Sequence, residues 1–279
     1  MGDTGLTPSG LTWRVAAASV IGKQHEDAGG RCEDAWYITR RVVPGVDQEV
    51  VATCVCDGAG SASRGWLGAA LVSKLVSSWL VANFVRMQEM SKEDVGHEVV
   101  ATAKRSLRRL AAKEHINLRE FACTIVAVAV AQDGRWVAIH LGDGGIIGQF
   151  STGLKPVSVP KKGEFANETF FVTDDDAATN IDIQMSSSTA EPTSPSGFAL
   201  FSDGVEASLV NRRSMEVAPV LATMLGWLIE NSEEEVTEAI EANLKTVFRQ
   251  KTGDDCTLAL LACHQNGASR DQVLVKAKY

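Results

Sequence analysis

Residues 48–60 read QEVVATCVCDGAG, a run of mostly small and β-branched apolar residues that stops at an aspartate followed by glycine. Such a run predicts a buried β-strand over residues 48–56. The Asp57-Gly58 step predicts a loop, because aspartate bonds its own backbone and glycine accepts a positive φ. A strand that ends on a carboxylate is therefore the unit to look for elsewhere in the chain.

Similar strand signals lie on both sides of this run. Upstream, residues 36–43 lead through Pro44-Gly45 back into the run, as in two neighbouring antiparallel strands. Asp133-Gly134 predicts a hairpin between two later strands. The other segments predicted as strands are residues 13–21, 121–131, 135–141, 145–150, 169–173, 181–185, 198–201 and 256–263.

Helical periodicity marks two pairs of segments. In residues 66–87 the apolar positions are Leu67, Leu71, Leu75, Trp79 and Leu80. A second helix follows Ser91, which resembles a capping residue together with Asp94, and its apolar stripe is Val95, Val99, Leu107 and Leu110. Residues 215–230 form a third predicted helix, and a fourth starts at Ser232 and stops at Gly253.

Clustered strands with paired helices predict an α+β fold of two antiparallel sheets with helices outside, and not alternating βαβ units. A length of 279 residues is ample for a single large domain. A net charge of −8 argues against nucleic acid or an anionic membrane as the main partner.

Three features that the sequence lacks predict the cellular location of the protein. Residues 1–10 lack a basic region followed by an apolar segment, so they are not a secretory signal. No apolar run is judged long enough to cross a bilayer. The six cysteines lie mostly in apolar runs and are interpreted as buried free thiols, and Cys54 and Cys56 have no second cluster to complete a zinc site. We therefore expect a cytoplasmic protein with no membrane contact.

Acidic residues recur where predicted strands begin or end: Glu33-Asp34, Asp57, Asp143, Asp203 and Asp254-Asp255. Any one of them alone is ordinary turn chemistry. Strand ends that meet at one rim would bring several carboxylates together, and such a cluster is tolerated when a hard cation neutralises it. Oxygen ligands of this kind suit Mg²⁺ or Mn²⁺.

Five motifs in this order resemble the type-2C metal-dependent protein phosphatases, the PPM family, over about residues 14–263. They are Glu33-Asp34-Ala35-Trp36, Val55-Cys56-Asp57-Gly58-Ala59-Gly60, Leu141-Gly142-Asp143, Phe201-Ser202-Asp203-Gly204 and Asp254-Asp255-Cys256-Thr257. His25, Gly30, Cys32 and residues 164–169 are similar to a short bacterial branch of that family. The resemblance implies one four-layer αββα domain, a central antiparallel sandwich flanked by pairs of helices, with residues 160–195 as a variable flap-like segment.

The resemblance also implies roles for individual residues. Two Mn²⁺ or Mg²⁺ ions would share Asp57. Glu33 and the Gly58 carbonyl would complete one ion, Asp203 and Asp254 the other. Asp34 would orient metal-bound water, and Asp143 matches a ligand of a third ion. The implied reaction is attack by metal-bridged hydroxide on a phosphoserine or phosphothreonine, and the implied partners are phosphorylated proteins, such as a serine/threonine kinase or its targets.

Some positions depart from the family pattern. Ala207 stands where an aspartate usually helps to hold the third ion, and the adjacent Glu206 is expected to point elsewhere. Gly29 stands where many members have a phosphate-binding arginine, for which Arg31, Lys23, His25 and Arg64 are candidate substitutes. Ala59 stands where some members have a general-acid histidine, a role that His25 could fill instead.

Two alternative readings use the same residues. Gly58-Ala59-Gly60 after a strand mimics a dinucleotide-binding turn, but the third glycine comes too late and Asp57 would meet the anion. The departures at Gly29 and Ala207 would also suit a pseudophosphatase, a catalytically weak binding module. The retained Glu33, Asp57, Asp203 and Asp254 favour the active enzyme.

Overall fold

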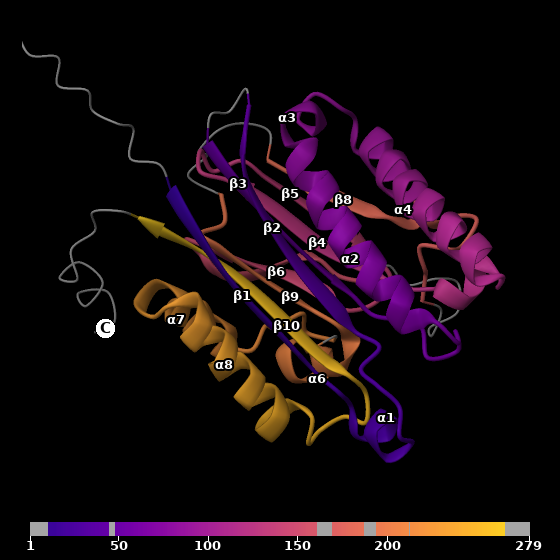
Figure 1. Cartoon of the computed structure of the whole chain (residues 1–279). Coiled ribbons are helices and arrows are strands. Elements are labelled where there is room, and N and C mark those ends of the chain that lie inside the picture. Colours follow the sequence, from indigo (N-terminus) through magenta and orange to yellow (C-terminus); the bar gives the residue numbers. More distant parts are fainter. Residues whose placement is uncertain (1–10, 45–47, 161–168, 187–193, 212, 266–279) are drawn as a thin grey trace, which may run out of the picture.

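The computed structural model describes residues 11–44, 48–160, 169–186, 194–211 and 213–265. Within these ranges the strands form two antiparallel sheets of five (Figure 1). One sheet has the order β1-β10-β9-β6-β7 and the other β2-β3-β4-β5-β8. The strands are β1 (Leu11–Val20), β2 (Ala35–Val43), β3 (Gln48–Cys56), β4 (Ile125–Ala131), β5 (Trp136–Leu141), β6 (Gly145–Phe150), β7 (Gly153–Ser158), β8 (Asp182–Met185), β9 (Gly197–Phe201) and β10 (Cys256–Gln265).

Helices cover the outer face of each sheet, so the predicted four-layer α+β sandwich is confirmed (Figure 1). The longer helices α2 (Gly65–Ala82) and α4 (Lys92–Glu114) lie outside the β3 sheet, and α7 (Val220–Glu230) and α8 (Glu233–Asn243) lie outside the β10 sheet. The shorter helical segments are α1 (Lys23–Asp27), α3 (Phe84–Met87), η1 (Leu118–Phe121), α5 (Ala177–Asn180), α6 (Asp203–Leu209) and η2 (Leu244–Phe248).

Alternation along β3 explains why both faces of this strand are buried. Val50, Ala52 and Cys54 pack with the α2 and α4 helices, whereas Val51 and Val55 face the interior between the two sheets. Successive side chains of a strand point to opposite faces, so a run that is apolar except for the buried Thr53 suits a strand that is covered on both sides. The core between the sheets also contains Trp13 and Phe198, whose rings lie 6.2 Å apart.

Helix α2 corrects one expectation from the sequence. By length and composition it is apolar enough to cross a membrane, contrary to the sequence-based expectation, and half of it is buried in the fold. It packs against β2, β3 and β4 on one side and α4 on another. That position explains its apolar composition as that of a core helix.

Parts of the sequence reading lie outside the described residues. These are residues 1–10, most of the motif at 164–169, and residues 161–168 and 187–193 of the proposed flap. The predicted strand at 169–173 is wrong: residues 169–171 are irregular, residues 172 and 173 lie in a turn, and the Val172 N–H donates one hydrogen bond to the Cys123 carbonyl.

Candidate metal centre

The predicted acidic sites meet at one rim of the sandwich because the strand registers are level there. Ala35 pairs with Cys56, so Asp34 at the start of β2 lies beside Asp57 at the end of β3. Gly145 pairs with Phe201, which brings Asp143 before β6 close to Asp203 after β9. Each sheet therefore contributes carboxylates to the same place.

Three aspartates form the centre of this cluster. Carboxylate oxygens of Asp57, Asp143 and Asp203 all lie within 4.8 Å of one another. Thr124 holds the backbone of Asp57 through two hydrogen bonds. The Asp57 N–H donates to the Thr124 hydroxyl at 3.0 Å, and the Asp57 carbonyl accepts from the Thr124 N–H at 2.9 Å. The fold brings these groups together, and a hydrogen bond between the Asp57 and Asp203 side chains partly offsets the rise in the pKa of Asp203.

The proximity of these carboxylates is costly when all are charged. Burial, and then the charges of Asp34 and Asp203, hold the pKa of Asp57 well above its ordinary value. Burial followed by the charge of Asp143 raises the pKa of Asp203 to about 7. Burial also raises the pKa of Asp143, although a 2.8 Å hydrogen bond from the Thr169 hydroxyl opposes this effect. A positive ion would remove the repulsion.

Asp34 lies behind this cluster in a closed environment. It is 8% exposed, and its Oδ2 accepts hydrogen bonds from the Ser202 and Thr257 hydroxyls at 2.7 and 2.6 Å. Its other oxygen, Oδ1, is buried with no hydrogen-bond partner within the described residues. Burial raises the pKa of Asp34 to about 7.

Glu33 and Gly58 meet through their backbones. The Gly58 N–H donates to the Glu33 carbonyl at 3.2 Å. A β-carbon at Gly58 would lie 2.5 Å from the Gly65 backbone and 2.8 Å from the Glu33 carbonyl oxygen, so this close approach requires glycine. Burial raises the pKa of Glu33, and its Oε2 is buried without a hydrogen-bond partner among described residues.

Asp254 lies at the exposed edge of the cluster, and Asp255 lies beneath it. Asp254 adds its charge to those that raise the pKa values of Asp57 and Asp203. The buried Asp255 accepts the Gly22 N–H on Oδ1 and the Glu33 N–H on Oδ2, both at 2.6 Å. His25 Nδ1 lies 2.9 Å from the same Oδ2. Burial opposes the charged imidazole, but Asp255 outweighs it and raises the pKa of His25.

The donor set fits hard divalent cations better than softer metals. The cluster offers carboxylate oxygens, and buried oxygens of Glu33, Asp34 and Asp203 have no hydrogen-bond donor among the described residues. Buried polar atoms normally have a partner, so these oxygens are suited to bind cations that prefer oxygen ligands. Mg²⁺ and Mn²⁺ are cations of that kind.

Comparison with known proteins agrees with this geometry. A family described as protein phosphatase 2C matches residues 21–248, which is more than half of the chain. The chain belongs to the protein phosphatase 2C family.

The relatives extend the match over nearly the whole chain. It is 28% identical to serine/threonine-protein phosphatase 3 of Escherichia coli strain K12 over 256 residues, covering 90% of this chain and 98% of the relative. In fold it is similar to a bacterial serine phosphatase, with a TM-score of 0.62, 16% identity, and coverage of 91% of this chain and 99% of the other. The catalytic domain of PstP, crystallised with two manganese ions, gives a TM-score of 0.55 at 16% identity, with coverage of 91% and 99%.

These findings confirm the predicted class of enzyme, a metal-dependent protein phosphatase of the 2C family that acts on phosphorylated proteins. They give no support to the pseudophosphatase alternative. The roles of single residues stay predictions. The family match also ends at residue 248, before Asp254 and Asp255.

The roles of two acidic residues of this phosphatase 2C were not predicted. Asp255 was seen only as a neighbour of Asp254, although its buried carboxylate holds the Glu33 backbone. Glu206 was expected to point elsewhere, but its charge contributes to raising the pKa values of Asp143 and Asp203, so it lies near both. Ala207 is exposed on the same helix, α6.

The candidate phosphate-binding residues of this phosphatase 2C make different contacts. Lys23 Nζ donates to the Gln250 side chain at 2.6 Å, and His25 contacts Asp255. Arg31 lies over the Trp66 ring, 4.3 Å from its centroid. Its charge partly offsets the raised pKa of Glu33, which places Arg31 near that end of the cluster. Gly29 has a φ of 67°, a conformation in which an arginine would be strained.

Proposed function

We propose that this chain removes phosphate from phosphoserine and phosphothreonine in proteins, using two Mn²⁺ or Mg²⁺ ions held at the rim of the sandwich. The observation that carries the proposal is the convergence of Asp57, Asp143 and Asp203 within 4.8 Å, with contributions from both sheets. The two manganese ions of the PstP catalytic domain support the number of cations.

We assign the ligands from the resemblance to the family. Asp57 is central and would serve both ions, Glu33 and the Gly58 carbonyl would complete one, and Asp203 and Asp254 the other. Asp143 adjoins Asp57 and Asp203. It would serve a third ion, which the absence of a carboxylate at Ala207 would leave weakly held. When bound, such ions lower the pKa of water and polarise phosphoryl oxygens.

The remaining side chains would position the substrate and move protons. Two hydroxyls fix Oδ2 of Asp34, and Oδ1, which has no hydrogen-bond partner among the residues described, would orient a water and accept its proton. Arg31, steadied by Trp66, supplies positive charge for the phosphate at the Glu33 end. His25 is oriented by Asp255 and can offer a proton from its other nitrogen.

The cellular setting is also proposed. The six cysteines are free, and the Cys54 and Cys56 sulfurs lie 3.6 Å apart without a disulfide. Unbridged thiols at that distance are consistent with a reducing cytoplasm. Within it, a serine/threonine kinase or the targets of one would be natural substrates.

A direct assay tests this function. The purified chain is incubated with p-nitrophenyl phosphate or a phosphothreonine peptide in Mn²⁺, Mg²⁺ or EDTA. Phosphate release should require the metal and stop in EDTA. No release with Mn²⁺ from neutral to alkaline pH would overturn the proposal.

Asp57→Asn tests the ligand assignment. The variant should lose at least about 100-fold in activity, because a neutral amide cannot neutralise two cations, and calorimetry should show weakened Mn²⁺ binding. Asp175→Asn, which changes an exposed aspartate outside the cluster, is the matched control and should behave as the wild type. Unchanged Mn²⁺ affinity in Asp57→Asn would remove Asp57 from the site.

A further inference from the structure

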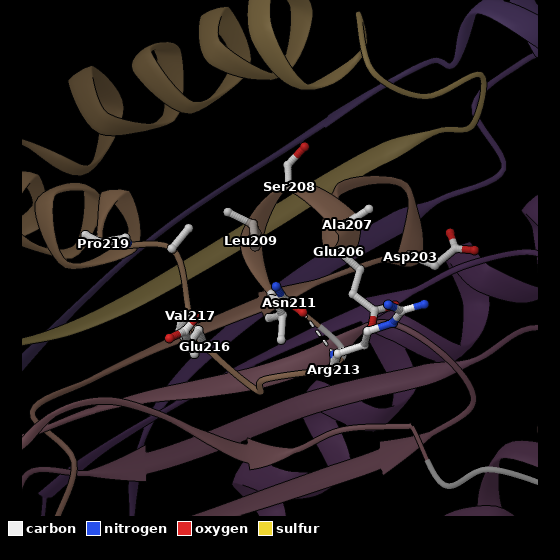
Figure 2. Close-up of a pocket in the computed structure, with 12 residues that line it drawn as sticks. Asp203, Glu206, Ala207, Ser208, Leu209, Asn211, Arg213, Glu216, Val217 and Pro219 are labelled. Carbon is white, nitrogen blue, oxygen red and sulfur yellow. Dashed lines mark hydrogen bonds between the residues drawn. The ribbon is translucent and has the colours of Figure 1, made fainter.

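The surface next to the metal centre is acidic. A cavity of about 810 Å³ runs along helix α6, where Asp203, Glu206 and Glu216 line it together with Arg213 (Figure 2). Asp203 also belongs to the carboxylate cluster at the rim. Because like charges repel, neither the cavity nor the metal-free rim is suited to bind an acidic segment of another protein.

Basic side chains gather instead on the C-terminal half of helix α4. Residues 99–113 contain no acid and five cations, although acidic residues outnumber Lys and Arg in the whole chain by 35 to 27. These cations are Lys104, Arg105, Arg108, Arg109 and Lys113. Lys104 is buried and its Nζ donates to the Asp174 carbonyl, whereas the other four side chains are exposed.

Three of the exposed cations surround a hollow on the helix. Arg105, Arg108 and Arg109 line a cavity of about 450 Å³ together with Ala101 and Ala112. These positions share one face of the helix because they are spaced by three, four or seven residues. The small alanine side chains leave room beside the long arginines. No acidic residue lines this cavity within the part of the chain that the structure describes.

This arginine cluster is unpaired among the described residues. Arg105, Arg108 and Arg109 make no hydrogen bond or ion pair there, and the preceding acid in the helix, Glu98, already pairs with Arg86. Like charges three or four residues apart on a helix destabilise it. An acidic ligand would therefore relieve a repulsion that the protein itself leaves uncompensated.

The size of the face suits a short segment of protein. From Ala101 to Ala112 the helix rises roughly 16 Å, at about 1.5 Å per residue. An extended segment covers that distance with about five residues, at about 3.3 Å each, and guanidiniums bind carboxylates through paired hydrogen bonds. A long nucleic acid or a membrane would also meet the rest of a chain whose net charge is −8.

We propose that the α4 face formed by Arg105, Arg108 and Arg109 binds an acidic segment of the phosphoprotein substrate, at a distance from the phosphorylated residue. The chain runs from the end of α4 through η1 to Thr124, which holds the Asp57 backbone, so a short stretch connects this face to the metal centre. The inference rests on the proposed phosphatase function and adds a docking surface for the substrate.

Peptide binding to the metal-free protein tests the surface directly. A short fluorescent peptide rich in glutamate is compared, by anisotropy in EDTA, with the same peptide carrying glutamine. Without metal, no cation at the rim can attract the acidic peptide. The glutamate peptide should bind about tenfold more tightly, as expected for two or three exposed ion pairs. The difference should shrink as salt is added.

Substitution of the arginines shows whether the α4 face causes the preference. The triple variant with Arg105→Gln, Arg108→Gln and Arg109→Gln should bind the two peptides equally. Because these residues lie outside the metal centre, the triple variant should hydrolyse p-nitrophenyl phosphate at the wild-type rate. Thermal unfolding confirms that its fold is retained.

A matched control removes the same charge from other elements. It carries Arg41→Gln on β2, Lys74→Gln on α2 and Lys155→Gln on β7, which are all exposed positions. This variant has the net charge of the triple variant, yet it should keep the preference for the glutamate peptide.

Kinetics connect the surface to the proposed reaction. A phosphothreonine peptide is joined through a flexible linker of glycine and serine to the glutamate segment or to its glutamine counterpart. The glutamate form should have a KM lower by up to about tenfold at unchanged kcat, because docking adds binding that does not change in the reaction. The triple variant should lose this difference, and the control should keep it.

The outcomes separate the two proposals. Equal binding of the two peptides by the wild type, or a preference that the triple variant keeps or the control loses, overturns the docking surface. Tighter binding of a single-stranded oligonucleotide or of anionic lipid vesicles than of the glutamate peptide would overturn the choice of a protein partner, and an unchanged KM would overturn that of the substrate. A chain that hydrolyses no probe with Mn²⁺ overturns the phosphatase proposal, while binding in EDTA still decides the surface.

Discussion

Gly58 is the residue at which three stretches of backbone come together. Its missing side chain lets the Gly65 and Glu33 backbones approach the loop after β3, while its neighbour Asp57 faces the carboxylate cluster. The same small residue therefore permits the close packing of backbone around the loop.

Substitution of Gly58 should be far more damaging than substitution of another glycine. Gly58→Ala should lower the free energy of unfolding by about 3 kcal/mol or more, because the new β-carbon would overlap rigid backbone. Gly226→Ala is the matched control. Nothing lies within 4 Å of its added carbon in α7, so it should stabilise the protein by about 0.5–1 kcal/mol. Urea unfolding measures both, and equal effects would contradict this account.

Single residues were predictable from sequence where chemistry and position coincide. Asp57, Asp143 and Asp203 were selected because each adjoins a predicted strand, and the sheet registers bring them together. Glu206 was misjudged because its helix, α6, was not predicted from Asp203-Gly204. The hydrogen bonds of Asp255 could not be read either, because its partners Gly22 and Glu33 are more than 200 residues away in the chain.

At the scale of elements, Asp255 joins three segments. Its carboxylate at the start of β10 holds Gly22, which precedes α1, and Glu33, which precedes β2. The β-carbon position of Gly22 would lie 2.3 Å from the Asp254 backbone, so the two segments are in direct contact. These contacts fix the position of the Glu33 backbone next to the metal centre.

Asp255→Asn and Asp254→Asn should separate stability from metal binding. An amide at position 255 keeps one accepting oxygen for three donors, so the metal-free protein should lose about 1–3 kcal/mol of stability. Because Asp254 is exposed, the Asp254→Asn variant should lose little stability but should bind Mn²⁺ more weakly. Urea unfolding in EDTA and calorimetry with Mn²⁺ check the pair. Equal stability of the two variants would show that Asp255 is not a structural joint.

Most strands were predictable because both of their faces are buried, which leaves long apolar runs such as β3 and β10. Residues 169–173 misled the reading because their apolar side chains pack over the rim without strand pairing. Val172 is buried in the outer core, and Phe171 packs against Ala59 and Ala62. For α2, the stripe of Leu67 and Leu71 is only half-buried, whereas Val72 and Val76 are fully buried. A helix that packs on two neighbours has two apolar faces, and its sequence does not show which of the two is more deeply buried.

At the scale of the whole molecule, the carboxylate cluster produces electrostatic repulsion between the two sheets. Asp57 extends from the β3 sheet and Asp203 from the β10 sheet, and the charge of Asp203 helps to raise the pKa of Asp57 in the metal-free protein. Cations that bind both would turn a repulsive contact between the sheets into an attractive one.

The stability of the metal-free protein should therefore fall as pH rises. Asp34 and Asp203 have pKa values of about 7 in the fold, against 3.8 ordinarily, so the folded chain binds more protons than the unfolded chain between these values. In EDTA, Tm should drop by at least about 5 °C from pH 5 to pH 8. Differential scanning calorimetry measures it.

Mn²⁺ provides the control for the pH experiment. Because metal replaces protons on the same oxygens, the rise in Tm that Mn²⁺ produces should be larger at pH 8 than at pH 5. A metal-free Tm that is flat or rises over this range would contradict the assignment of raised pKa values to Asp34 and Asp203.

The pairing of β1 with β10 has a consequence for how the protein is made. Leu11 pairs with Gln265, whereas the β3 sheet needs nothing beyond Met185. On a ribosome, the β3 sheet can form while its sister sheet still lacks the strand between β1 and β9. Asp254 and Asp255 arrive with that last strand. The nascent chain should therefore be unable to act on any phosphoprotein until translation has passed β10.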